Sequence, residues 1–102
     1  MLAKAKQLGL RITIPATALA QAMRNPARQA QLSRRLRHAG TDLIPLDGPD
    51  ATAVGRLLAR SRSADIVDAH VVVCAERAGD VVVTSDPVDI RRLSDSIKLF
   101  VV

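Results

Sequence analysis

Hydrophobic and polar residues follow two different periods along the chain, which together predict a mixture of helices and strands. Apolar residues three or four positions apart are typical of helices, and short apolar runs bounded by Gly or Pro are typical of strands. The predicted helices are Ala3–Leu8, Thr17–Met23, Ala27–Ala39, Ala51–Arg60, Ala64–Ala78 and Pro87–Leu93. The predicted strands are Arg11–Ile14, Asp42–Leu46, Val81–Thr84 and Ile97–Val102.

The segment Ala64–Ala78 carries conflicting signals. Its valines favour a strand, but the run is longer than an ordinary strand. Val67, Val71, Cys74 and Ala78 follow a stripe at intervals of three and four residues. This spacing places them on one face of a helix, so the segment is interpreted as a buried helix.

The order of these elements predicts an α/β sandwich with a mostly parallel sheet. With 102 residues, of which 48% are hydrophobic, the chain is expected to form a single globular domain over residues 1–102. No apolar run approaches the roughly 18 residues that a membrane span needs. The opening MLAKAKQLG is too polar for a secretory signal. We therefore expect a cytoplasmic protein with no membrane partner.

The balance of charges favours a polyanionic partner. Fifteen Lys and Arg residues against ten Asp and Glu residues give a net charge of +5, which suits nucleic acid or an acidic protein. Phe100 is the only aromatic residue, so a base-stacking platform cannot be built. A nucleic-acid ligand would therefore be held mainly by its backbone. Arg91 and Arg92 are the best candidates for a phosphate contact because they closely follow a candidate metal ligand, Asp89.

Four acids lie beside predicted strand ends or helix starts: Asp65, Asp68, Asp86 and Asp89. Ligands of open parallel sheets bind beyond the carboxyl ends of the strands, and Asp86 follows such an end. Mg²⁺ prefers converging carboxylate oxygens of this kind, and two such ions could activate a water against a phosphodiester. The same acids also suit helix capping, because Asp86 precedes a proline and Asp65 precedes Asp68 by three residues. The two interpretations stay open, since one carboxylate can serve both.

The remaining nucleophilic or metal-binding residue types carry less information. Cys74 is the only cysteine, which rules out an internal disulfide, and its apolar neighbours predict a buried, inert thiol. His38 and His70 are expected at the edge of the core or on the surface. No metal cage of the cysteine type can be formed from this sequence.

The segments DIVDAHVVVCA (65–75) and VVVTSDPVDI (81–90) resemble the C-terminal half of a PIN domain, as in VapC-type toxins of bacterial toxin–antitoxin pairs. IPATALAQ (14–21), PLD (45–47) and the Gly55-x-Leu57-Leu58 pattern resemble the middle of the same domain, so the resemblance spans nearly the whole chain. It implies a PIN-like three-layer α/β/α sandwich. It also implies an endoribonuclease that depends on Mg²⁺ or Mn²⁺, forms a homodimer and pairs with a VapB-like antitoxin.

The resemblance also implies roles for individual residues. Asp68 matches the helix-borne metal aspartate of the family, and Asp86 matches the acid after the fourth strand, so both are the expected catalytic and metal-binding residues. Asp89 is an accessory metal ligand of the same motif. Thr84 and Ser85 are expected to support this loop.

Two departures from the family pattern concern the metal site. The family begins with a central strand that carries an essential aspartate, and Met1 falls after the position of that strand. The family's second acid is replaced by Gln21, whose neutral amide adds no negative charge. We therefore expect weak metal binding and weak cleavage. The neighbours of the missing strand would have unpaired edges that a partner chain, a swapped dimer or a rearranged sheet must cover.

Three functions follow from these considerations. The first is a PIN-type ribonuclease that is impaired by the missing acids. The second is a non-catalytic PIN remnant that serves as a protein-interaction or dimerisation module. The third, a basic RNA-binding domain, is supported by the charge alone.

Overall fold

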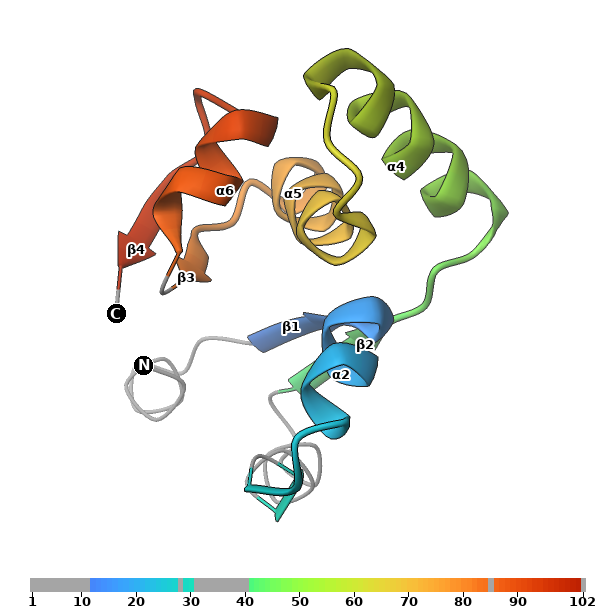
Figure 1. The fold of residues 1–102 in the computed structure, drawn as a ribbon, viewed down its shortest axis with the longest axis vertical. Helices are drawn as coiled ribbons and strands as arrows, with labels where there is room; N and C mark the ends of the chain where they lie inside the picture. Colours follow the sequence, from blue (N-terminus) through green and yellow to red (C-terminus); the bar gives the residue numbers. More distant parts are fainter. Residues whose placement is uncertain (1–11, 28, 31–40, 85, 102) are drawn as a thin grey trace.

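A computed structural model of the protein describes residues 12–27, 29–30, 41–84 and 86–101. The fold is mixed α/β, as the sequence predicts, with helices alternating with short parallel strands (Figure 1). The helices are α2 (Ala16–Met23), α4 (Gly48–Ser61), α5 (Ile66–Ala78) and α6 (Pro87–Leu93). The strands are β1 (Ile12–Pro15), β2 (Thr41–Ile44), β3 (Val82–Thr84) and β4 (Leu99–Val101). The predicted helix Ala3–Leu8 and most of Ala27–Ala39 lie outside the described residues.

The strands among the described residues form two separate sheets of two strands each. β1 pairs with β2, with Ile14 opposite Leu43, and β3 pairs with β4, with Val83 opposite Phe100. Both pairs are parallel, which requires a crossover between their members. The parallel strand direction is therefore confirmed, and the parallel sheet is divided into two parts.

Helix α5 is the centre of the packing. It contacts α2, α4, α6, β1 and β3, and in Figure 1 it lies between α4 and α6. Ala69 and Val72 on this helix are fully buried. At Ala69, the small side chain lets neighbouring backbones approach the helix closely. The buried apolar core consists of Val54, Leu57, Ala69, Val72, Ala75, Val82, Ile90, Leu93 and Ile97.

The helical interpretation of the valine-rich segment is confirmed, but the predicted buried stripe is partly wrong. Ala78 is exposed, and the buried residues are instead centred on Ala69 and Val72. The helix ends at Gly79, whose backbone has φ 69°. Glycine adopts this left-handed conformation without a steric penalty, so it is a natural helix terminator.

Candidate metal centre

The first half of the candidate site is the N-terminus of α5. Asp65 occupies the N-cap position, and its Oδ1 accepts a hydrogen bond of 3.0 Å from the backbone N–H of Asp68. This bond satisfies one of the amide groups that a helix start leaves without a partner. The capping prediction for Asp65 is therefore confirmed, and the cap fixes the turn from which the carboxylate of Asp68 projects.

The second half is the N-terminus of α6, which is built differently. Asp86 is at the N-cap position and Pro87 follows it, but the Asp86 side chain makes no capping hydrogen bond. Instead, the backbone N–H of Asp86 donates to Oγ1 of Thr84 at 2.9 Å. The prediction that Asp86 caps its helix is therefore wrong for its side chain. The supporting role predicted for Thr84 has a structural counterpart in this hydrogen bond, and Ser85 lies outside the described residues.

The charges at both helix starts affect the pKa of the Asp68 carboxyl. Partial burial and then the negative charge of Asp65 are the main causes that raise the pKa of the Asp68 carboxyl to about 6, with Asp89 and Asp86 adding to the effect. Desolvation and nearby like charges both disfavour an ionised carboxylate. The carboxylate of Asp68 is thus close enough to three other acids, two of them on another helix, to be affected by their charge.

Asp89 and Asp86 interact directly within the same turn. The hydrogen bond between their side chains, followed by the charge of Asp86, raises the pKa of Asp89. Arg92 opposes this effect only in part, since its Nη1 lies 3.9 Å from Oδ1 of Asp89 and both side chains are exposed. These four acids, Asp65, Asp68, Asp86 and Asp89, are here called the acidic cluster. Among the described residues, Arg92 is the one cation paired with them, and it does not neutralise their combined charge.

The oxygens of the acidic cluster do not converge tightly. In the described part of the chain, the only group of three donor residues whose ligand atoms all lie within 4.8 Å of one another is elsewhere, at Asp50, His70 and Cys74. A Mg²⁺ ion with several retained waters tolerates such a spread, because some protein oxygens can be reached through its water shell. The acidic cluster therefore offers the carboxylate oxygens that hard cations prefer, but it does not form a dehydrated cage.

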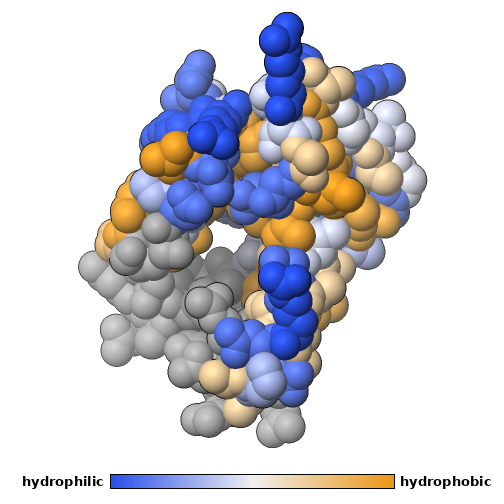
Figure 2. Space-filling view, viewed as in Figure 1, coloured by the Kyte–Doolittle hydropathy of each residue, from blue (hydrophilic) through white to orange (hydrophobic). Residues whose placement is uncertain are grey.

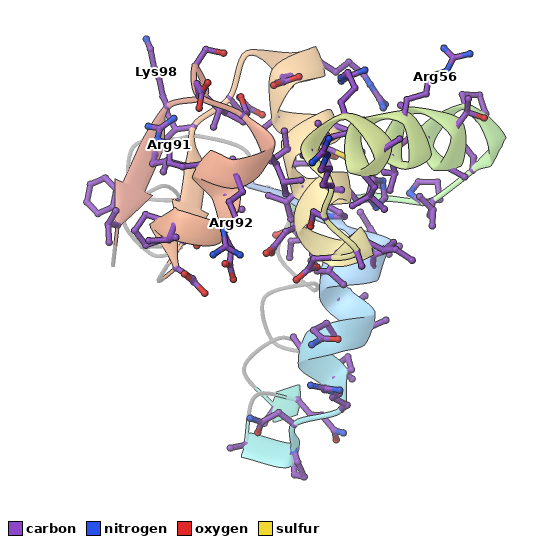
Figure 3. The ribbon with its side chains drawn as sticks, turned by 45° about the horizontal axis from the view of Figure 1, so that its top comes forward. Arg56, Arg91, Arg92 and Lys98 are labelled. Atoms are coloured by element: carbon purple, nitrogen blue, oxygen red, sulfur yellow. The ribbon has the colours of Figure 1, made fainter. Side chains whose placement is uncertain are left out.

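Of the two predicted phosphate-binding arginines, only Arg92 is directed toward the acidic cluster. Nη1 of Arg91 donates to the backbone carbonyl oxygens of Asp95 at 3.0 Å and Ile97 at 2.6 Å. Arg91 therefore holds the segment between α6 and β4. Figure 3 shows the two side chains leaving α6 in different directions. Both arginines, together with Pro87 and Val88, line an open hollow beside the helix.

Gln21 is not part of the acidic cluster. It is exposed on α2, and within the described residues no hydrogen bond joins it to any of the four acids. Helix α2 packs instead against α5 and β1.

A second polar cluster, which the sequence did not predict, lies inside the molecule. Asp50 is 3% exposed and His70 is 0% exposed. Nε2 of His70 lies 3.0 Å from Oδ2 of Asp50, and Nδ1 lies 2.8 Å from Oγ1 of Thr17. The guanidinium of Arg77, whose side chain is 54% exposed, donates to the other oxygen of Asp50 from the surface. These four side chains, here called the buried network, connect α2, α4 and α5.

The side chains of the buried network satisfy one another's hydrogen bonds, as in a structural contact. The hydrogen bond from His70 is the largest cause that lowers the pKa of Asp50, and the contact with Arg77 lowers it further. Cys74 is buried, as predicted. Burial raises the pKa of its thiol, and the charge of Asp50 adds to this effect, which disfavours the reactive thiolate. An added cation here would be repelled by Arg77 and would compete with existing hydrogen bonds.

The expectation that His70 lies at the core edge or the surface is wrong, because its ring is enclosed on all sides. No local pattern indicated this, because the backbone of Asp50 belongs to the helix start that follows Asp47. Oδ1 of Asp47 accepts a hydrogen bond of 2.9 Å from the Asp50 N–H. The side chain of Asp50 points into the core while its backbone completes the cap.

Comparison with known proteins leaves the family open: no protein-family model matches the chain, and no curated protein is significantly similar to it. Among the described residues, no helix is both long and apolar enough to cross a membrane.

Proposed function

We propose that this protein is a PIN-type endoribonuclease that depends on Mg²⁺ or Mn²⁺, with its metal site at Asp68, Asp86 and Asp89. The observation that carries the proposal is the meeting of carboxylates from two helix starts, about twenty residues apart in the sequence, around Asp68. The mutual repulsion of these carboxylates is the kind of unfavourable charge that a bound cation relieves. The oxygen donor set also suits Mg²⁺ and Mn²⁺.

The local structure supports distinct roles for the surrounding residues. The Asp65 cap holds the start of α5, and the bond from the Asp86 N–H to Thr84 directs the loop before α6. The Asp86 side chain is not used for capping, and its contact with Asp89 is one that a cation shared by the two carboxylates would replace. When bound, the cation would neutralise charge on a phosphodiester and lower the pKa of a coordinated water.

The charge of the chain is consistent with RNA as the substrate. The net charge of +5 favours a polyanion, and Arg92 places a cation beside the acidic cluster. The near absence of aromatic residues favours recognition of the RNA backbone over its bases. A cytoplasmic location, a homodimeric state and a VapB-like antitoxin as partner belong to the same proposal.

We expect the activity to be weak. Gln21 supplies no negative charge and is outside the acidic cluster, and the cluster is loose. A non-catalytic interaction module is the second candidate. It is favoured by the division of the described strands into two sheets of two strands each, because small sheets of this kind are often extended by another chain.

A titration with Mg²⁺ and Mn²⁺, followed by thermal unfolding, separates these two candidates. A ligand at ten times its Kd stabilises the folded state by about 1.4 kcal/mol, so the melting temperature of the native chain should rise with either ion. The rise should be lost in Asp86→Asn and kept in Asp80→Asn, which removes an exposed acid outside the cluster. No rise at millimolar ion would favour the interaction module.

An RNA cleavage assay completes the test. We expect slow cleavage of single-stranded RNA that requires the divalent ion, is abolished in Asp68→Asn and is unchanged in Asp80→Asn. Cleavage that persists in Asp68→Asn would contradict the proposed site. Fast cleavage by the native chain that Asp68→Asn abolishes would show that the site is not impaired.

A further inference from the structure

The open hollow beside α6 combines apolar and cationic side chains. It has a volume of about 390 Å³ and is lined by Pro87, Val88, Arg91 and Arg92. Residues four positions apart are neighbours on a helix surface, so one turn of α6 supplies the apolar part and the next turn supplies the two arginines. Figure 2 shows hydrophobic and hydrophilic residues side by side over this helix. Ligand pockets begin at about 300 Å³, so the hollow has room for a single nucleoside.

The two arginines of the hollow differ in what their donors already bind. Nη1 of Arg91 is held by the carbonyl oxygens of Asp95 at 3.0 Å and Ile97 at 2.6 Å, so this guanidinium is fixed. The side chain of Arg92 is 70% exposed, and among the described residues its one ion pair is with Asp89, with 3.9 Å between Nη1 and Oδ1. That separation is too long for a hydrogen bond. The planar donors of Arg92 can therefore turn toward a ligand in the hollow.

The described residues that line the hollow offer hydrogen-bond donors and no side-chain acceptor. Proline and valine side chains offer neither, and arginine offers donors only. A ligand that suits Arg92 therefore presents two adjacent acceptors, which the guanidinium can bind at the same time. On the major-groove edge of the bases, guanine alone presents two acceptors, O6 and N7, whereas adenine and cytosine present an amino donor there. That donor would have no acceptor among these side chains.

A phosphate would also accept two hydrogen bonds from Arg92, but the surroundings favour a base. Val88 is 61% exposed, and a phosphate would leave it and Pro87 uncovered, whereas the faces of a purine ring would cover them. Asp89 is also close to Arg92, and its negative charge disfavours a second anion more than a neutral base. The hollow therefore suits a neutral ring with acceptors on one edge.

We propose that the hollow binds a guanine base of the RNA substrate, with the Arg92 guanidinium donating to O6 and N7. The inference rests on the proposed function for the identity of the substrate as RNA. Because Asp89 and Arg92 are three residues apart on one helix, with about 5–6 Å between their Cβ atoms, the base belongs to a nucleotide next to the phosphodiester at the acidic cluster. The rest of the RNA is held by its backbone, and the hollow makes the protein selective at one position.

Short RNA probes test the proposal without cleavage. Four pentanucleotides carry guanine, adenine, cytosine or 7-deazaguanine between two uridines on each side, and their binding is measured by fluorescence anisotropy at low salt without divalent ions. We expect the guanine probe to bind about tenfold more tightly than the adenine and cytosine probes, at the lower end of what one bidentate contact provides. The 7-deazaguanine probe lacks N7 and has the same phosphates, so it should lose most of this advantage. Equal binding of all four probes, or a preference for adenine or cytosine, would overturn the assignment.

Matched variants locate the contact on the protein. Arg92→Lys keeps the positive charge but loses the planar pair of donors, so its preference for guanine should fall to about onefold while its affinity for the adenine probe is unchanged. Arg56→Lys makes the same change on α4, where Figure 3 shows Arg56 projecting away from α6. This control should keep the tenfold preference. A preference that survives in Arg92→Lys, or that is lost in Arg56→Lys, would place the contact elsewhere.

The outcome can be separated from that of the metal site, because the binding assay uses neither a divalent ion nor cleavage. A chain that does not cleave RNA but prefers guanine through Arg92 would confirm the hollow as a base site and would contradict only the nuclease activity. A chain that cleaves RNA through Asp68 but shows no preference for guanine would overturn the present inference and leave the proposed function intact.

Discussion

The buried network and the acidic cluster use the same residue type to opposite effect. Asp50 is enclosed beside His70 and Arg77, and these partners lower its pKa. Partial burial raises the pKa of Asp68, and the charges of Asp65, Asp89 and Asp86 raise it further. A carboxylate with cationic and hydrogen-bond-donating partners strengthens the fold, whereas one among like charges weakens it until a cation binds. The comparison separates a structural acid from a candidate functional acid.

The largest expected effect tests the structural side of this comparison. Asp50→Ala leaves the buried His70 ring without its carboxylate partner, and an unsatisfied buried polar group of this kind costs about 1–3 kcal/mol. Arg77 adds little, because its side chain is 54% exposed and can be hydrated. Urea unfolding measures the loss of stability, with Asp80→Ala as an exposed control expected within about 0.5 kcal/mol of the native chain. A loss below about 1 kcal/mol for Asp50→Ala would mean that the network contributes little.

A smaller effect distinguishes the two helix starts of the acidic cluster. Asp65→Ala removes a capping hydrogen bond and should cost about 1 kcal/mol. Asp86→Ala removes no such bond, so the stability of that variant should equal or exceed that of the native chain. Asp65→Ser removes the same charge but keeps a capping oxygen, and it should recover most of the loss. Equal losses for the two alanine variants would contradict the different roles assigned to Asp65 and Asp86.

The smallest effect concerns pH. The pKa of Asp68 rises from 3.8 to about 6 on folding, so the folded state favours its protonated form. The stability that this provides is complete below about pH 4 and is lost as the pH rises through about 6. Because the side chain is partly exposed, solvent screening keeps the effect below about 1 kcal/mol. Asp68→Asn should remove this component of the pH profile in thermal unfolding without divalent ions. An unchanged profile would place Asp68 outside the influence of the other acids.

The sequence by itself determined most of the local structure. Periodicity located α5 despite its valines, and Asp65 begins that helix as predicted. Gly79 at the end of α5 and Asp47 at the start of α4 are equally local signals. These features depend on residues within one or two turns of each other, so a short window of sequence contains the physical cause. The class of the fold followed for the same reason, since the order of such elements restricts the ways in which they pack.

The tertiary structure alone decided which side chains meet. The positions of Asp50 and His70 in the sequence gave no sign that their side chains form a hydrogen bond inside the core. The proline after Asp86 predicted a capping hydrogen bond that the Asp86 side chain does not make. The division into two sheets also depends on strand pairing between distant segments. Contacts of this kind are set by packing and by electrostatics over long sequence separations, and neither leaves a local pattern in the sequence.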